Sequence, residues 1–120
     1  MPVLPEYGLT GKTAILATSG GREAPFLGQA LVEAGASVFA VARTQTLLDA
    51  VLASLPPGSG GAVMDAGVPD SAKGVMEQFD QTHDKVDILV NDPRSMYAKP
   101  LEEISAGEWD AVQTRNAKAP

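Results

Sequence analysis

The feature that most constrains this chain is a repeated order, in which a short apolar run precedes a longer segment with helical spacing of its apolar residues. This order occurs four times. The apolar runs, each typical of a buried strand, are Thr13–Ala17, Ser37–Ala42, Ala62–Met64 and Val86–Val90. Strands separated by helices pair in parallel through right-handed crossovers. The sequence therefore predicts an α/β fold, an open parallel sheet with helices on both faces, and ligand binding at the carboxyl ends of its strands.

The helical segments carry recognisable end signals, and they are expected at 25–34, 44–55, 70–83 and from 105 to the chain end. Pro25 suits a first turn, where its missing N–H is not needed, and Gly35 suits a glycine cap at a helix end. Thr44 can cap the second helix, and Ser105 with Glu108 forms a capping box. The apolar residues expected to face the core are Phe26, Leu27, Ala30, Leu31, Ala34, Leu47, Leu48, Val51, Leu52, Leu55, Ala72, Val75, Met76, Phe79 and Trp109.

Length and composition limit the functional classes. The 120 residues predict a single domain over 1–120, and 44% hydrophobic with 20% charged residues is typical of a globular chain. A net charge of −6 argues against a nucleic-acid partner. The chain has no cysteine for disulfides, nucleophilic catalysis or metal binding, and no apolar run long enough to span a membrane. Without a secretory signal at its start, the chain is expected to be cytoplasmic, with no metal site and no membrane partner.

Four segments in order carry a resemblance to a known family: "LTGKTAILAT" (9–18), "LVEAGASVFAVAR" (31–43), "VDILVN" (86–91) and "PLEEISAGEWDAVQTRNAKAP" (100–120). Over nearly its whole length, the chain resembles the N-terminal half of a short-chain dehydrogenase/reductase. The resemblance implies a Rossmann-like open parallel sheet of about four βα units, truncated after the fourth. It also implies descent from NAD(P)-dependent oxidoreductases.

The cofactor loop of that family reads T-G-x-x-x-G-x-G, and here Ala17 takes the threonine position. Thr18, Arg22 and Ala24 take the three glycine positions, so all three glycines are absent. Ser19, Gly20 and Gly21 could instead form an anion-holding turn in front of a helix N-terminus, and Arg22 could add a bidentate phosphate contact. The alternative is a strand-to-helix loop that no longer binds a cofactor.

The family resemblance assigns further residues to the cofactor site. Arg43 follows the second strand, and Ala42 stands where an acidic residue would bind an NAD ribose, which favours the 2′-phosphate of NADP. Asp65 matches an aspartate near the adenine, and Asn91 matches an asparagine that holds the sheet together. Each has a plain alternative: a solvated arginine, a loop or capping aspartate, and a structural amide.

After Asn91 the chain departs from the family's N-N-A-G motif, because Asp92, Pro93 and Arg94 follow it. Pro93 and Arg94 would narrow the space for the ribose and nicotinamide. Asn116 matches the catalytic asparagine that supports a proton relay, with a helix-surface amide as the alternative.

The family's Ser and Tyr-x-x-x-Lys do not occur in this chain. Gly11 stands four residues after Tyr7, and Leu101 stands four residues after Tyr97. His83, the only histidine, is expected to pack near a helix end rather than to act in catalysis.

Two functions remain open. The first is the N-terminal nucleotide-binding portion of an NADP-dependent oxidoreductase, which is not catalytically complete on its own and acts on a small molecule once completed. The second is a non-catalytic Rossmann-type binding or assembly module with a decayed cofactor site and no cofactor. An open sheet edge predicts association, as a homodimer, a swapped arrangement or a complex with a complementary C-terminal fragment.

Overall fold

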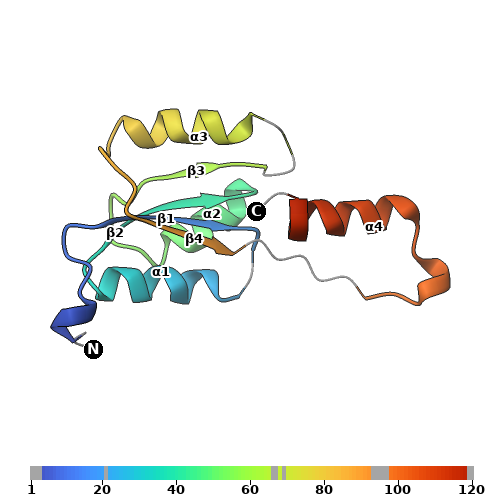
Figure 1. The fold of residues 1–120 in the computed structure, drawn as a ribbon, viewed down its shortest axis with the longest axis horizontal. Coiled ribbons are helices and arrows are strands. Elements are labelled where there is room, and N and C mark those ends of the chain that lie inside the picture. The colour runs from blue at the N-terminus through green and yellow to red at the C-terminus, as the bar shows by residue number, and fades with distance from the viewer. Residues whose placement is uncertain (1–3, 21, 66–67, 69, 93–97, 119–120) are drawn as a thin grey trace.

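The fold is a four-stranded, all-parallel sheet with helices on both faces (Figure 1). The structure, a computed structural model, describes residues 4–20, 22–65, 68, 70–92 and 98–118. The strand order is β3-β2-β1-β4, so the predicted α/β architecture is confirmed. In chain order the elements are η1 (Pro5–Tyr7), β1 (Thr13–Thr18), α1 (Ala24–Glu33), β2 (Ser37–Ala42), α2 (Gln45–Leu52), β3 (Gly61–Val63), α3 (Ser71–Asp80), β4 (Ile88–Asp92), η2 (Leu101–Glu103), α4 (Ala106–Gln113) and η3 (Thr114–Lys118).

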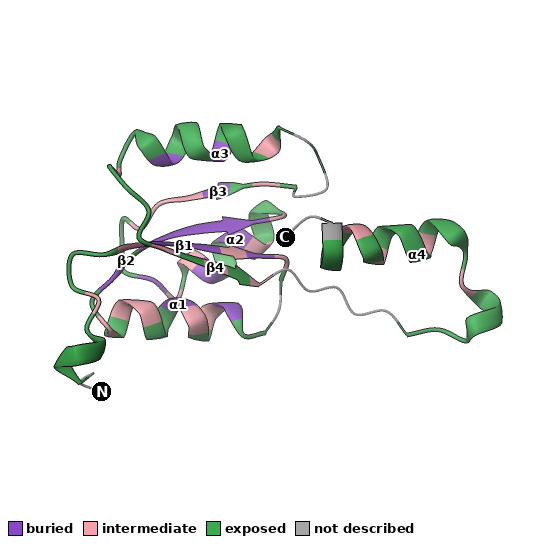
Figure 2. Cartoon of the chain, viewed as in Figure 1, coloured by how far each residue is buried: buried purple, intermediate pink, exposed green. Residues whose placement is uncertain are grey.

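The core lies in two layers, one on each face of the sheet (Figure 2). Because side chains alternate along a strand, Leu16 of β1 faces α1 and α2, whereas Ile15 faces α3. The two largest fully buried side chains are Leu16 and Phe79, one in each layer. Both faces of β1 and β2 are therefore covered, which explains the continuous apolar runs in the sequence.

The predicted end signals form as expected. The Thr44 hydroxyl accepts a hydrogen bond from the Leu47 N–H at 3.3 Å, and Ser105 and Glu108 form a complete capping box. After α1 the chain turns at Gly35, whose φ is 105°. The N–H of Gly35 donates to the carbonyl of Val32 at 2.9 Å, and the next N–H donates to the carbonyl of Leu31 at 3.0 Å. This Schellman arrangement requires a left-handed residue, so glycine is the fitting choice.

The start of β4 is fixed beside the start of β1 by a carboxylate. Asp87 accepts the N–H of Thr13 through Oδ2 at 2.8 Å, and its own N–H donates to the Thr13 carbonyl at 2.9 Å. The bond from Thr13 lowers the pKa of the Asp87 carboxyl below its ordinary value of 3.8, and Lys85, 3.3 Å away, adds to this effect. These contacts set the register in which Thr18 lies opposite Asp92 at the other end of the pair.

The predicted inward face of α1 was partly wrong. Phe26 is 70% exposed and Ala30 is exposed, whereas Ala24 and Gly28 are the buried residues of the helix. The reason is the close approach at Gly28, where an added Cβ would lie 2.9 Å from a methyl of Leu55. Because α1 is buried along the face that carries Ala24 and Gly28, the side chain of Phe26 is turned away from the sheet. In α3, likewise, Val75 and Phe79 are buried but Ala72 and Met76 are exposed.

The expectation that Trp109 belongs to the core was also wrong, because its side chain is 60% exposed. Helix α4 continues directly into η3 and lies outside the sheet, on the side of the carboxyl ends of its strands (Figure 1). On the α3 side of the sheet, an apolar hollow of about 320 Å³ is lined by Ile15, Met76 and Leu89 among others. Within the described residues, no strand pairs with the outer edge of β4. Both the hollow and α4 thus keep apolar surface that no other described residue covers.

Candidate functional site

The predicted site residues gather at the carboxyl edge of the sheet. Thr18 ends β1 and lies in register with Ala42 of β2 and Asp92 of β4. Arg43 directly follows β2, and Asp65 follows β3 by two residues. The fold therefore brings these residues to one edge, together with Ser19, Gly20, Arg22 and Asn91. Gly21, which was predicted in the same loop, lies outside the described residues, as do Pro93 and Arg94.

The loop between β1 and α1 is tied to the end of β4. Thr18 is only 6% exposed, and its hydroxyl donates to Oδ2 of Asp92 at 3.0 Å while accepting the N–H of Gly20 at 3.1 Å. The N–H of Ser19 donates to the Asp92 carbonyl at 3.1 Å. The backbone donors of Ser19 and Gly20 are therefore engaged inside the chain. The anion-holding turn of Ser19, Gly20 and Gly21 stays a prediction, in which a bound anion would have to replace these two acceptors.

Gly20 serves packing rather than a ligand in this arrangement. Its φ is 109°, a left-handed value that glycine adopts without strain. A Cβ at this position would lie 3.0 Å from both methyl carbons of Leu47, which belongs to α2. The close approach that this glycine allows is thus to the neighbouring helix.

The N-terminus of α1 already carries a carboxylate. Glu23 is the N-cap residue, and Pro25 in the first turn has no N–H to offer a ligand. The positive end of a helix dipole attracts anions, but a carboxylate at this position competes for that field with any phosphate. Arg22 is exposed beside it and provides one opposing positive charge.

Arg43 provides the observation that favours a ligand. Its Nε is buried and has no hydrogen-bond partner among the described residues. Buried donors without an acceptor are rare in folded proteins, because such a group loses its water without compensation. An oxygen-rich group bound here, such as a phosphate, would supply the missing acceptor.

Asp65 and Asn91 differ in how they are placed. The Asp65 carbonyl accepts the Ser71 hydroxyl at 2.8 Å and the Val68 N–H at 2.9 Å, so this residue orders the turn into α3. Asn91 is exposed within β4, lies in register with Ala17, and lines the apolar hollow. The side chain of Asp65 is exposed and can face a ligand at the edge.

Asn116 is exposed in η3, the five-residue continuation of α4, so it belongs to the last helix and not to a strand end or to a loop that directly follows a strand. In the described residues, no cluster of His, Asp and Glu could hold a metal ion.

The edge therefore suits the 2′-phosphate of NADP better than its diphosphate. Among the described residues, its cationic side chains are Arg22 and Arg43, and its carboxylates are those of Glu23, Asp65 and Asp92. The orphaned Arg43 donor fits the 2′-phosphate end of the cofactor. The β1–α1 loop does not fit a diphosphate as it stands, since its described donors are used and acids flank it.

Sequence reasoning missed two contributions to this site. Asp92 was taken only as a departure from a motif, and Glu23 was not considered. The Thr18–Asp92 bond spans 74 residues of sequence, so only the pairing of β1 with β4 could reveal it. Glu23 had a local signal, because it stands two residues before Pro25, which suits a first helical turn.

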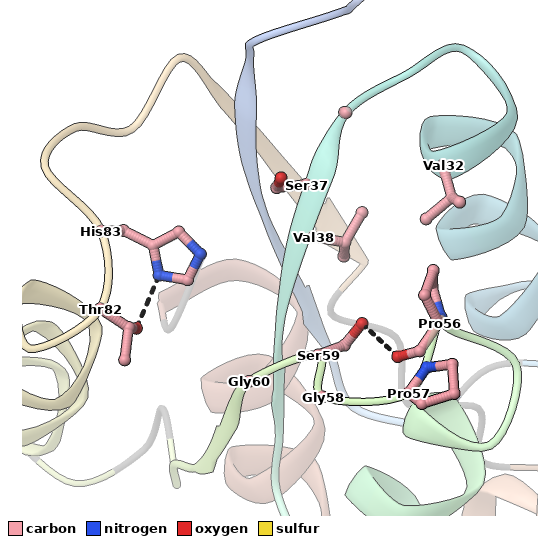
Figure 3. A pocket seen from close by; sticks show the side chains of 11 residues that line it. Val32, Ser37, Val38, Pro56, Pro57, Gly58, Ser59, Gly60, Thr82 and His83 are labelled. Carbon is pink, nitrogen blue, oxygen red and sulfur yellow. Dashed lines mark hydrogen bonds between the residues drawn. The ribbon is translucent and has the colours of Figure 1, made fainter.

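A second cavity, of about 300 Å³, lies at the opposite, amino edge of the sheet (Figure 3). Figure 3 shows Thr82 and His83 on one side and Pro56 and Pro57 on the other. The His83 ring stacks on Phe79 with centroids 4.7 Å apart, and its Nδ1 lies 2.8 Å from the Thr82 hydroxyl in a hydrogen bond. His83 therefore has the packing role predicted for it and takes no part in the carboxyl-edge site.

Comparisons with known proteins agree with this architecture. A family model described as short chain dehydrogenase matches residues 24–120, beginning immediately after the β1–α1 loop. A short-chain type dehydrogenase/reductase from Mycobacterium marinum is similar in structure, with a TM-score of 0.83 and 22% identity, over 94% of this chain and 47% of that one. A mutant short-chain dehydrogenase/reductase from Serratia marcescens has a TM-score of 0.75 and 22% sequence identity. That match covers 92% of this chain and 47% of the other chain. The chain thus spans about half the length of these structures.

Proposed function

This chain belongs to the short-chain dehydrogenase family, and we propose that it is the N-terminal nucleotide-binding portion of an NADP-dependent oxidoreductase of that family. The proposal treats residues 1–120 as a single Rossmann-like domain. It is supported by the family match over 24–120 and by a sheet whose carboxyl edge gathers the predicted residues. The chemistry of the bound cofactor would be hydride transfer at its nicotinamide.

The observation that carries the proposal is the buried Nε of Arg43, which lacks an acceptor among the described residues. A guanidinium matches a phosphate in charge and in hydrogen-bond geometry. Because Ala42 offers no carboxylate to a ribose, the position favours a 2′-phosphate, hence NADP over NAD.

The other site residues take supporting roles in this proposal. Asp65 would lie near the adenine, and Arg22 would contact phosphate only after the loop formed by Thr18, Ser19, Gly20 and Gly21 has given up its present hydrogen bonds. Asn91 would hold the end of β4. Asn116 would support a proton relay once the missing Ser and Tyr-x-x-x-Lys are supplied by a completing portion.

Calorimetric titration with NADPH and NADH tests the proposal. We expect NADPH to bind the wild-type chain in the micromolar range and NADH to bind about tenfold more weakly, because only NADPH offers Arg43 a phosphate. Arg43→Ala should abolish this preference. The control is Arg115→Ala, which removes the same charge from an exposed position in η3.

Two results would contradict the proposal: equal affinity for both nucleotides, or an NADPH affinity unchanged by Arg43→Ala. Circular dichroism of each variant establishes that the sheet and helices are retained. A folded wild-type chain that binds neither nucleotide would favour the second function.

That second function is a non-catalytic binding or assembly module with a decayed cofactor site. The observation in its favour is the state of the β1–α1 loop, where the Ser19 and Gly20 donors are engaged and Glu23 occupies the N-cap position of α1. A loop relieved of cofactor binding can settle into contacts of this kind with the rest of the fold.

We also propose that the chain works in association, as a homo-oligomer or with a complementary C-terminal fragment. The uncovered hollow beside β4 and the exposed Trp109 of α4 support this, since both leave apolar surface in water. A cytoplasmic location and a small-molecule substrate for the completed protein complete the proposal. Among the described residues, no helix has the length and apolar character needed to cross a membrane.

A further inference from the structure

The two residues that most change the nucleotide edge are bonded to each other. Thr18 stands at the first glycine position of the cofactor loop, and Asp92 stands one residue after Asn91 in β4. They lie directly opposite in the parallel pair, and the Thr18 hydroxyl donates to Asp92 Oδ2 at 3.0 Å. We propose that Thr18 and Asp92 form a latch that closes the β1–α1 loop to the diphosphate of a dinucleotide. The site then favours a ligand held through an adenosine 2′-phosphate, an inference that rests on the proposed function.

The latch acts first through hydrogen bonds. The Thr18 hydroxyl links two groups, because it donates to the Asp92 carboxylate and accepts the Gly20 N–H at 3.1 Å. The Asp92 carbonyl accepts the neighbouring Ser19 N–H at 3.1 Å. A diphosphate bound at this loop would need those backbone donors, and it would have to displace acceptors that already satisfy them.

The latch acts secondly through charge. Asp92 places a carboxylate at the end of β4, and Glu23 places another at the N-terminus of α1, so acids flank the loop on both sides. A diphosphate in this position would meet two like charges, of which the half-buried Asp92 is screened less by water than the exposed Glu23.

Arg43 lies on the other side of β1. The sheet order is β3-β2-β1-β4, the latch joins β1 to β4, and Arg43 follows β2. A ligand without a diphosphate therefore has no need of the latched loop, and it can bind the Arg43 guanidinium while the latch stays closed, once the side chain turns its buried Nε toward the ligand. The ligand class that fits is a nucleoside 2′-phosphate, of which adenosine 2′-monophosphate is the simplest probe.

The test compares that probe with NADPH by calorimetry on four proteins. The wild-type chain should bind the two ligands within about threefold of each other, because the diphosphate and nicotinamide half adds little. Asp92→Asn removes the charge, and Thr18→Val removes the bridging hydroxyl at nearly constant shape. Each should strengthen NADPH binding by about tenfold and leave the probe's affinity unchanged. The matched control is Asp84→Asn, which removes one exposed carboxylate near the amino edge and should change neither affinity.

Hydrogen exchange provides a readout that needs no ligand. The amides of Ser19 and Gly20 should be protected in the wild-type chain and exchange faster in Thr18→Val. Free exchange in the wild type would overturn the latch, even if both variants fail to fold. Unchanged NADPH affinity in folded Asp92→Asn and Thr18→Val would overturn it as well. If adenosine 2′-monophosphate does not bind the wild type, the Arg43 site and the proposed function fail, whereas the exchange result still decides the latch.

Discussion

At the scale of single residues, small side chains determine how closely the elements approach. Gly61 begins β3 opposite Ala40 of β2, and a Cβ there would lie 2.8 Å from the Ala40 carbonyl oxygen and 2.7 Å from a methyl of Leu48. Gly74 lies in α3 and is exposed, and an added Cβ would meet nothing within 4 Å. A side chain at Gly61 would therefore clash with its neighbours, whereas at Gly74 it would change only the backbone entropy of the unfolded chain.

Alanine at these two glycines should change stability in opposite directions. Gly61→Ala should lower the free energy of unfolding by about 1–3 kcal/mol, because the backbone oxygen of Ala40 cannot move aside without breaking the sheet. Gly74→Ala should raise it by about 0.5–1 kcal/mol, because alanine loses less backbone entropy in a helix. Urea unfolding followed by circular dichroism measures both. A stabilised Gly61→Ala variant would contradict the close approach of β3 to β2.

At the scale of elements, α2 and α4 share a capping chemistry but not a packing environment. Thr44 caps α2, which buries Leu48 and Val51 against the sheet. Ser105 caps α4, which has no buried residue. Short helices are marginal in water without tertiary contacts, so α4 relies on its cap more than α2 does.

Removing each cap should therefore have different consequences. Thr44→Ala should lower global stability by about 1 kcal/mol, because α2 unfolds only with the core. Ser105→Ala should leave the global midpoint unchanged and speed hydrogen exchange in α4 alone. Urea midpoints and segment-resolved exchange on both variants provide the comparison. Equal shifts of the midpoint would mean that α4 is coupled to the core after all.

At the scale of the whole molecule, the fold is more extended than a compact domain of the same number of residues. Its radius of gyration is 15.9 Å and its extents are 52 × 31 × 24 Å. A compact domain of this length has a radius of about 13–14 Å. The projecting α4 accounts for the excess, and it leaves Trp109, Leu89 and Leu101 exposed in the same chain as an apolar hollow (Figure 2).

We therefore expect the chain to associate as its concentration rises. Sedimentation velocity should show species above the monomer mass of 12.4 kDa in the micromolar range. Trp109 is the only tryptophan, so its emission should shift to shorter wavelength as partners cover it. Leu89→Asp should weaken association, because it places a charge in the hollow. A single monomeric species at every concentration, with constant Trp109 emission, would refute the expectation.

The sequence alone determined the order of strands and helices, the capped starts of α2 and α4, and the family, because each rests on neighbouring residues. The bounds were less exact: β4 is Ile88–Asp92 where Val86–Val90 was predicted, and α2 ends at Leu52 where Leu55 was predicted. The run Ser37–Ala42, the Thr44 cap, the Ser105–Glu108 box and the Gly35 turn all form where the local pattern predicts them. Hydrogen bonds within a turn and side-chain alternation along a strand depend on spacings of two to five residues. Such spacings can be counted in the sequence without knowing what each element touches.

Only the tertiary structure decided which faces are buried and which donors are free. Phe26 and Trp109 are apolar at helical spacing, yet both are exposed, because Gly28 sets the contact line of α1 and α4 does not reach the sheet. The loop at residues 18–20 has the composition of an anion-binding turn. The Ser19 donor is engaged because Asp92, 74 residues from Thr18 in the sequence, is brought beside it by the pairing of β1 with β4, whereas Gly20 donates locally to the Thr18 hydroxyl. Burial and hydrogen-bond satisfaction depend on groups far apart along the chain, and their meeting is a property of the folded sheet.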